Sequence, residues 1–484
     1  MMVAATDLRR LGLPLADDAP ASLPVVADSR QVTSGAVFVA CAPAPVDRAA
    51  HLRQAHERGA AWSVAERDDG PAIAGAWLPV AEPRAWYARA VVRAHGLQQG
   101  EHPPLVGITG TDGKTSVACF VQQLTGLGAA RIGTLGASSG LDVRPATHTT
   151  PPTAELCRFI QSLPSACPVV AIECSSHGLA QGRLGDLPLA AGVFTGLGRD
   201  HFDYHGDQEA YRAAKLRLVA QLAPGAVLVV NADDPVFEAV RAAAVERDVV
   251  VIGLGVTAGD WRLVEEDDGG VALRSVTDDR SWPVVSPSPG LFNFWNVAAA
   301  CLVLRSLGHD LDEVIARSQH LRPVPGRLER IGQQPIAYVD YAHTPDAIER
   351  VLAVVRQAHS ARRLVCVFGC GGDRDRGKRP VMGRAALAAD LAVLTADNPR
   401  SEAQSAIAAD VLAGLDEQQR QRCHRHDDRG RAIAEGLRLA GPAGVLVVCG
   451  KGHEQEQEIA GQRRPWDDRA VLRQLLAQSA GEEQ

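Results

Sequence analysis

The sequence lacks the features of a secreted, membrane-inserted or metal-scaffolded protein. Its ten cysteines are scattered, and no two have the C-x-x-C spacing. This pattern argues against a disulfide framework or a structural zinc site and favours a reducing compartment. No apolar stretch approaches the ~18–20 residues of a membrane helix, and the N-terminus has no apolar core of a signal peptide. We therefore expect a cytoplasmic protein with no membrane insertion.

The chain also lacks a basic excess, internal repeats and low-complexity tracts. Its formal net charge is −7, whereas a nucleic-acid-binding protein normally presents a basic face. A hydrophobic content of 46% and a charged content of 22% are ordinary for a globular protein with full cores. A length of 484 residues suggests three domains at ~150 residues each.

Residues 105–116 form the most informative segment, an apolar run followed by a glycine-rich loop that ends in Lys114-Thr115. Strand, loop and helix in this order build a cradle for nucleotide phosphates. In such a cradle Lys114 supplies a positive charge, and the Thr115 hydroxyl is a ligand for Mg²⁺. A strict Walker motif needs glycine where Ile108 stands, so the segment fits instead the variant G-x-T-G-T-x-G-K-T. The alternative is an ordinary glycine-rich turn between a strand and a helix.

Apolar runs alternate with helical stretches over the rest of the chain, which predicts an α/β fold with parallel sheets. Two polar, proline-containing linkers, 98–104 and 322–327, divide the chain. The buried strands that we expect are residues 169–172, 191–194, 227–230, 337–339, 364–368, 391–394 and 445–448. Ligands bind beyond the carboxyl ends of such strands, so the loops that follow them are the candidate sites.

Several of these loops carry unusual sets of polar residues. Glu173 follows one expected strand and is a hard oxygen ligand suited to Mg²⁺. Residues 199–206 hold two histidines and two aspartates, although a polar turn that caps the next helix explains them as well. Lys215 lies on an expected helix and is by default a solvated surface charge. Charged loops at 369–379, 397–400 and 450–454 follow three strands and should converge on one edge of a sheet.

These motifs together resemble the Mur ligases of peptidoglycan synthesis over nearly the whole chain. The matching segments occur in the order of the family: 28–30, 105–116, 149–151, 173–179, 199–206, Lys215, 340–346, 397–400 and 450–454. The resemblance implies three α/β domains. They are a UDP-substrate-binding domain at 1–102, a central P-loop-type ATP-binding domain with a parallel sheet at 103–328, and a Rossmann-like amino-acid-binding domain at 329–484.

The implied activity is that of an ATP-dependent carboxylate–amine ligase. The γ-phosphoryl group of ATP would activate the D-Glu side-chain carboxylate of UDP-N-acetylmuramoyl-L-Ala-D-Glu as an acyl phosphate, which the amine of meso-2,6-diaminopimelate then attacks. The resemblance implies a bacterial monomer that binds these small molecules, with no nucleic-acid partner. It also implies Mg²⁺ and a CO₂-derived carbamate on Lys215.

The resemblance assigns roles to individual residues. The catalytic residues would be Lys114, Glu173, His201 and Lys215. The metal ligands would be Thr115, Glu173, His201 and Lys215 as its carbamate. ATP would be bound by Gly110, Thr111, Asp112, Gly113, Lys114, Thr115, Ser116, Asn293, Asn296, Arg327, Asp340 and His343. The UDP-linked substrate would be bound by Ser29, Thr149, Thr150, Ser175, Gln181 and Arg183. Diaminopimelate would be bound by Arg374, Asp397, Asn398, Arg400, Gly450 and Glu454.

The choice of diaminopimelate rests on the sequence Asp-Asn-Pro-Arg at 397–400, the family's mark of that preference. Arg400 and Arg374 would grip the distal carboxylate, which lysine lacks. A site built on such hydrogen bonds can reject an analogue without the matching group by about 10⁴-fold.

Two departures from the family pattern affect what can be carried over. Asp112 stands where the family normally has asparagine, which brings a carboxylate close to the triphosphate. Residues 41–51 depart from the usual pattern at the uracil end, so no uracil contact is assigned there. The alternatives are a Mur-type ligase that uses lysine or another amino acid, an enzyme like folylpolyglutamate synthase, and a nucleotide-binding regulatory module without catalysis.

Overall fold

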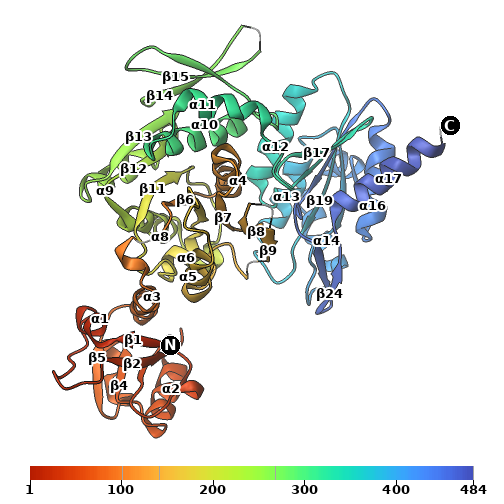
Figure 1. The fold of residues 1–484 in the computed structure, drawn as a ribbon. Coiled ribbons are helices and arrows are strands. Elements are labelled where there is room, and N and C mark those ends of the chain that lie inside the picture. The colour runs from red at the N-terminus through yellow and green to blue at the C-terminus, as the bar shows by residue number, and fades with distance from the viewer. Residues whose placement is uncertain (101, 141, 146, 268, 483–484) are drawn as a thin grey trace. The chain divides into compact units, whose positions relative to one another are not determined.

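The computed structural model describes residues 1–100, 102–140, 142–145, 147–267 and 269–482. Within these ranges the strands form three large sheets, with five, eleven and six strands, and one separate hairpin (Figure 1). The chain divides into two compact units. The first unit contains residues 1–199, 207–283 and 298–316, and the second contains 200–206, 284–297 and the chain from Arg317 onward. The α/β class predicted from the sequence is confirmed.

The first sheet, in the first unit, has the order β1-β2-β3-β4-β5. Its strands are β1 (Met2–Ala4), β2 (Ser22–Val26), β3 (Val37–Val39), β4 (Trp62–Ala65) and β5 (Ala76–Pro79). β2 to β5 pair in parallel, and only β1 is antiparallel. The helices are α1 (Ala5–Arg10), α2 (Pro45–Glu57) and α3 (Pro83–Ala94). Proline opens both α2 and α3, because its fixed φ suits the first helical turn.

The second sheet, also in the first unit, is centred on parallel strands. β6 (Leu105–Thr109) lies between β10 (Val170–Glu173) and β11 (Leu189–Phe194) and pairs with both in parallel. The parallel set continues through β12 (Leu222–Asn231) and β13 (Val250–Gly255) on one side and β7 (Ala130–Gly133) on the other. The prediction of a parallel sheet is therefore confirmed for the centre of the sheet.

Short strands that the sequence did not predict extend this sheet at both ends. At one edge β8 (Gly136–Ser139) pairs antiparallel with β7 and with β9 (Asp142–Arg144). At the other edge β14 (Trp261–Glu265) pairs with β13 in parallel and with β15 (Val271–Ser275) antiparallel, and β16 (Ser281–Val284) is the neighbour of β15.

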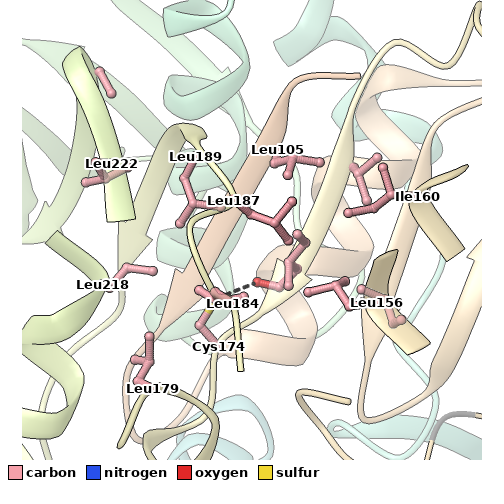
Figure 2. Close-up of a cluster of buried hydrophobic side chains, with 14 of the residues drawn as sticks. Leu105, Leu156, Ile160, Cys174, Leu179, Leu184, Leu187, Leu189, Leu218 and Leu222 are labelled. Atoms are coloured by element: carbon pink, nitrogen blue, oxygen red, sulfur yellow. Dashed lines mark hydrogen bonds between the residues drawn. The ribbon is translucent and has the colours of Figure 1, made fainter. Parts of the chain in front are cut away.

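The second sheet is covered by α4 (Lys114–Thr125), α5 (Thr153–Gln161), α6 (Ser176–Ala180), α8 (Gln208–Gln221) and α9 (Phe237–Val245). Leucines from strands, helices and loops pack into one buried cluster beside β6 and β10, and Figure 2 shows Leu105, Leu156, Leu184 and Leu218 among them. α11 (Leu311–Ala316) also belongs to this unit, whereas α10 (Leu291–Ser306) contributes residues to both units.

The third sheet, in the second unit, has the order β17-β18-β22-β19-β20-β21. Its strands are β17 (Glu329–Gln333), β18 (Ile336–Asp340), β19 (Leu364–Cys370), β20 (Leu391–Ala396), β21 (Cys423–Arg425) and β22 (Val445–Cys449). All neighbours are parallel except β17 and β18. Alternate residues of β18, β19, β20 and β22 enter opposite cores, as in a sheet buried on both faces.

One core of the third sheet includes α12 (Pro345–Ala358), α13 (Arg379–Ala386) and α14 (Gln404–Leu412), and the other includes α16 (Arg429–Ala440) and α17 (Asp468–Glu482). After β22 the sequence predicted a loop and then a helix. The structure instead has the hairpin of β23 (Glu456–Ile459) and β24 (Gln462–Pro465) before α17. No helix among the described residues is both long enough and apolar enough to cross a membrane.

Candidate active site

The glycine-rich segment forms the strand, loop and helix that its motif predicts. β6 ends at Thr109 and α4 begins at Lys114. Gly113 precedes the helix with a φ of 84°, a left-handed conformation that glycine adopts without a steric penalty. The Lys114 ammonium folds back over the loop and donates to the carbonyl oxygens of Gly110 (2.9 Å) and Thr111 (2.8 Å). Ser116 is buried, whereas Asp112 is exposed.

Glu173 is the charged group at the centre of this region. The register of β10 against β6 places it opposite Ile108, directly before the loop. The residue is 1% exposed. Its Oε2 accepts from the hydroxyls of Thr115 (2.8 Å) and Thr134 (3.0 Å), and its Oε1 accepts from the backbone N–H of Thr134 (2.9 Å). A buried carboxylate held by three donors is fixed in position, and its hydrogen bonds offset the cost of burying it.

Gly133 makes room for this carboxylate. A Cβ atom at Gly133 would lie 2.1 Å from Glu173 Oε1, so a side chain larger than hydrogen would displace the carboxylate. Thr134 links Glu173 to Thr149, because the Thr134 hydroxyl also lies 3.1 Å from the Thr149 hydroxyl.

Lys215, on α8, is buried and points toward the phosphate loop. The residue is 1% exposed, so the default reading of a helical lysine as a surface charge is wrong. Its ammonium donates to Gly110 O (2.6 Å) and lies 4.7 Å from the centre of the Tyr211 ring. Tyr211 Oη in turn lies 3.0 Å from the Thr111 hydroxyl. The helix and the phosphate loop are therefore connected at two points.

Four of the residues that the sequence assigns to the UDP-linked substrate meet beside Glu173. Thr150 donates to Glu173 O (2.7 Å) and accepts from the backbone N–H of Ser175 (2.8 Å). Arg183 donates to Thr150 O (2.5 Å) and to Gln181 Oε1 (2.8 Å). The substrate side and the nucleotide side of the predicted site therefore share one carboxylate residue.

In the first sheet, Ser29 is buried and donates to Gln54 Oε1 (2.5 Å). The divergent segment 41–51 has its own anchor. Arg48 is 5% exposed and donates to Asp69 (2.9 Å), Glu66 (2.9 Å) and Pro43 O (3.0 Å). The segment that departs from the family pattern, which includes the start of α2, is thus held by one of its own residues, a buried arginine.

In the second unit, Asp340 at the end of β18 accepts from the backbone N–H groups of Leu328 (2.6 Å) and Ala342 (2.7 Å). The Arg327 guanidinium lies 4.4 Å from the centre of the Tyr341 ring, and the His343 ring lies 4.7 Å from it. Burial raises the pKa of Tyr341 to about 12. The structure therefore brings Arg327, Asp340 and His343 together around a neutral tyrosine that the sequence did not single out.

The remaining predicted residues of the second unit lie on short segments. Asn293 and Asn296 are both buried in the first turns of α10, and Asn293 donates to Pro289 O (2.7 Å). His201 is exposed, has a φ of 56°, and its Nε2 lies 3.3 Å from Asp200 Oδ2. It is the residue that precedes α7 (Phe202–His205), in the N-cap position.

The three charged loops converge at the carboxyl ends of β19, β20 and β22, which are neighbours in the third sheet. Arg400 donates to Gly372 O (2.6 Å), and the Asn398 amide donates to Glu454 Oε2 (3.0 Å). A Cβ atom at Gly450 would lie 2.6 Å from Asp397 Oδ2, so these loops also approach too closely for a side chain. Arg374 is exposed beside this cluster. The predicted convergence is confirmed.

His453 lies in the loop at 450–454, and its pKa is shifted strongly by its surroundings. Burial and the nearby Arg327 charge lower the pKa of His453 to about 3. Its ring is therefore neutral at physiological pH, and it packs 5.1 Å from the Tyr341 ring.

No group of three or more histidine, cysteine, aspartate or glutamate side chains within the described ranges is placed to hold a metal ion. Thr115 and Glu173 nevertheless form a pair of hard oxygen donors in direct contact. Mg²⁺ is commonly held by one or two carboxylates together with substrate phosphates and water, rather than by a complete protein cage. The chemistry of this pair therefore fits Mg²⁺ carried in with a nucleotide.

Sequence reasoning gave no role to several residues that hold the site together: Gly133, Thr134, Tyr341, Arg429 and Lys451. Arg429 donates to Asp468 and to the carbonyl oxygens of Ala396 and Cys449, at the ends of β20 and β22. Lys451 donates to Asn398 Oδ1 and Glu454 Oε2. Thr134 and Gly133 lie in the glycine-containing turn 133–136, and Lys451 lies inside the motif 450–454. Their positions next to recognised motifs were the available signal. Nothing comparable marks Arg429, which lies on a helix.

The fold and these loops define a class, that of α/β proteins with a nucleotide phosphate loop beside a buried carboxylate. Comparison with protein families identifies the family within this class. Residues 108–304 match the model of the Mur ligase middle domain, and residues 326–452 match that of the Mur ligase, glutamate ligase domain. The chain belongs to the Mur ligase family.

Two curated relatives of the chain share one name. It is 39% identical to the UDP-N-acetylmuramoyl-L-alanyl-D-glutamate–2,6-diaminopimelate ligase of Chromobacterium violaceum, over 97% of this chain and 96% of the relative. It is 40% identical to the ligase of the same name from Ectopseudomonas mendocina, over 96% and 97%.

Solved structures agree at the level of the fold. A structure with the same ligase name aligns with a TM-score of 0.67 and 31% identity, over 99% of this chain and 100% of that chain. Folylpolyglutamate synthase of Mycobacterium tuberculosis, in complex with ADP, aligns with a TM-score of 0.60 at 20% identity, over 76% of this chain and 92% of that chain. At that identity the second likeness shows the fold alone.

Proposed function

We propose that this protein is an ATP-dependent ligase that joins meso-2,6-diaminopimelate to the D-Glu side-chain carboxylate of UDP-N-acetylmuramoyl-L-Ala-D-Glu. The full-length relatives that carry this name support the proposal. The observation in the structure that carries it is the position of Glu173. This one residue receives the phosphate-loop hydroxyl of Thr115 on its carboxylate and the Thr150 hydroxyl of the substrate-side cluster on its backbone carbonyl.

The reaction proceeds in two balanced steps. A carboxylate oxygen of D-Glu attacks the γ-phosphorus of ATP, the bond to the β–γ bridging oxygen breaks, and ADP leaves. The amine nitrogen then attacks the acyl carbon, loses a proton, and expels inorganic phosphate. Phosphoryl transfer requires positioning and charge neutralisation more than covalent help from the protein. Lys114 supplies a positive charge at the phosphates, and the backbone N–H groups of the loop cradle them.

Thr115 and Glu173 would hold Mg²⁺, which when bound neutralises negative charge on the transferring phosphoryl group. We assign Glu173, His201 and a carbamate on Lys215 to a second Mg²⁺. Carbamate formation replaces the Lys215 ammonium by a carboxylate-like anion, and the burial of this side chain next to Gly110 O puts it at the phosphate loop.

The other predicted residues keep their assigned ligands in this proposal. The cluster of Thr149, Thr150, Ser175, Gln181 and Arg183, together with Ser29, takes the UDP-linked substrate. Asn293, Asn296, Arg327, Asp340 and His343 take the nucleotide. We further propose domains at 1–102, 103–328 and 329–484, and a monomer acting in the bacterial cytoplasm, where ATP and UDP-linked precursors are made.

Diaminopimelate is favoured over lysine because the side chains of Arg400 and Arg374 lie beside Gly371, in the loop after β19. A Cβ atom at Gly371 would lie 3.2 Å from Arg400 Nη1 and 3.6 Å from Arg374 Cγ. The Arg400 guanidinium and the aliphatic stem of Arg374 therefore border the same small backbone segment. The planar fork of a guanidinium can pair with a distal carboxylate.

The test is phosphate release from ATP by the purified protein with Mg²⁺ and UDP-N-acetylmuramoyl-L-Ala-D-Glu. Three parallel reactions contain meso-diaminopimelate, L-lysine or no amine. We expect release only with diaminopimelate. Release with lysine alone would refute the substrate assignment and keep the ligase. ATP binding without release in any reaction would favour the regulatory module instead.

A further inference from the structure

Lysine is almost absent from this chain. Only four of its 50 basic residues other than histidine are lysines: Lys114, Lys215, Lys378 and Lys451. All the others are arginines. We therefore infer that arginine occupies the positions where either basic residue is acceptable. A lysine that remains indicates a position that requires a compact ammonium group and not a planar guanidinium.

Three of these lysines have contacts that fit this view. Lys114 and Lys215 both donate to Gly110 O in the phosphate loop. Lys378 ends the charged loop after β19 and donates to His343 O (3.3 Å). Lys451 is the fourth. It lies inside the motif 450–454, but neither the sequence analysis nor the proposed mechanism gives it a role of its own.

The Lys451 side chain is 0% exposed. Its ammonium donates to Glu454 Oε2 (2.7 Å) and to Asn398 Oδ1 (3.1 Å). The Asn398 amide also donates to Glu454 Oε2 (3.0 Å), so the three polar groups form a closed triangle. The backbone N–H of Glu458 donates to Asn398 Oδ1 (3.0 Å), which attaches the triangle to β23.

This triangle determines which oxygen of Glu454 remains available to a ligand. Oε2 of Glu454 already has two donors, whereas Oε1 has none among the described residues, and the Glu454 side chain is 32% exposed. One oxygen is thus held from the protein side, and the other is left for a donor from solvent or from a substrate. An ammonium group is the substrate donor that suits a carboxylate oxygen.

We propose that Lys451 is a positioning residue of the amino-acid site, and that it holds Glu454 and Asn398 so that Glu454 Oε1 receives an ammonium group of the amino-acid substrate. The inference rests on the proposed function for the identity of that substrate. An arginine at this position would bring five N–H donors in a planar fork into a buried space that offers two side-chain acceptors. The scarcity of lysine and the contacts of Lys451 therefore both indicate that this position requires a lysine.

The test compares Lys451→Met with the wild-type protein in the phosphate-release assay, with each of the three substrates varied in turn. Methionine retains the unbranched, buried stem without the charge. We expect the KM for diaminopimelate to rise about 10- to 100-fold, the range for loss of a hydrogen bond to a charged group. The KM values for ATP and for the UDP-linked substrate should stay within about threefold.

Arg438→Met is the matched control, because it also removes a cation paired with a carboxylate three residues away, Glu435, but on the exposed face of α16. All three of its KM values should equal those of the wild-type protein. Lys451→Arg should fail to restore the wild-type KM for diaminopimelate. A folded Lys451→Met protein with an unchanged KM for diaminopimelate would overturn the inference. Equal rises in all three KM values, or full activity of Lys451→Arg, would overturn it as well.

If Lys451→Met does not fold, the double variant Lys451→Met/Glu454→Gln replaces it, because it leaves no carboxylate without its cation. Its KM for diaminopimelate should lie within about threefold of that of Glu454→Gln alone, and a much larger value would overturn the inference. The wild-type reaction separately tests the proposed substrate. If lysine proves to be the amine, the same ratios are measured with lysine.

Discussion

The strongest stability prediction concerns the buried ion pair between Arg429 and Asp468. Both side chains are 0% exposed. Arg429 donates to both Asp468 oxygens (2.7 Å each), to Ala396 O (3.1 Å) and to Cys449 O (2.9 Å). Burial works to lower the pKa of Arg429, but the charge of Asp468 holds that pKa above its usual value. One guanidinium thus ties the ends of β20 and β22 to the start of α17.

Arg429→Met should be strongly destabilising, because methionine fills much of the space but leaves Asp468 as a buried charge without its cation, with the Trp466 indole N–H (2.7 Å) as its remaining side-chain donor. Removing one member of a buried pair costs about 3–5 kcal/mol, whereas an exposed pair contributes about 0–1 kcal/mol. At about 2–4 °C per kcal/mol for a folding unit of 150–250 residues, the melting temperature of the unit should fall by about 6–20 °C.

The assay is thermal unfolding of Arg429→Met, of Asp468→Asn and of the double variant, followed by circular dichroism. The double variant should be more stable than the sum of the two single losses predicts, because it contains no unpaired charge. Exposed Arg438→Met, on the same helix, should lower the melting temperature by no more than about 2 °C. A loss below about 1 kcal/mol in Arg429→Met, or simple additivity in the double variant, would refute this reasoning.

Three further perturbations test the rest of the site. Thr134→Val removes one hydroxyl from Glu173, so phosphate-release kinetics should show kcat/KM for ATP reduced about 10- to 100-fold, and Thr134→Ser should restore it. Asp112→Asn removes a negative charge from the exposed rim of the phosphate loop, so the KM for ATP should fall several-fold; an unchanged KM would show that Asp112 does not repel the triphosphate. The Arg379 guanidinium lowers the pKa of Glu402 to about 2, below its unfolded value near 4.5, so this contact stabilises the fold above pH 4.5 and is lost as pH falls toward 2. Acid unfolding of Glu402→Gln should lack that part of the pH dependence.

The parts of the site that the sequence predicted are those in which one short segment carries the chemistry. The phosphate loop needs its glycines, Lys114 and Thr115 within a few residues, so the motif alone indicates strand, loop and helix. The convergence of the loops after β19, β20 and β22 followed from the rule that parallel strands present their carboxyl ends at one edge. These predictions depend on local order and on a general rule of topology, and neither requires knowledge of distant contacts.

Such reasoning did not predict the short strands at the two ends of the second sheet or the hairpin after β22. A short edge strand such as β9 consists of exposed residues, so it carries no buried apolar run for a pattern to detect. β24 is likewise exposed along its length. Their pairing partners, and not their own composition, determine that they are strands.

The residues that hold the site together escaped prediction for a different reason. Thr134 is 39 positions from Glu173, and Lys451 is 53 positions from Asn398. A hydrogen bond over such a separation leaves no periodic signal, because either partner alone is an unremarkable threonine or lysine. What survives in the sequence is a constraint on residue choice: glycine where a carboxylate needs room, as at Gly133, and lysine in a chain that otherwise uses arginine. Such exceptions to a chain's own composition can therefore locate supporting residues that motif matching passes over, and Lys451 is the position where this principle can be tested most directly.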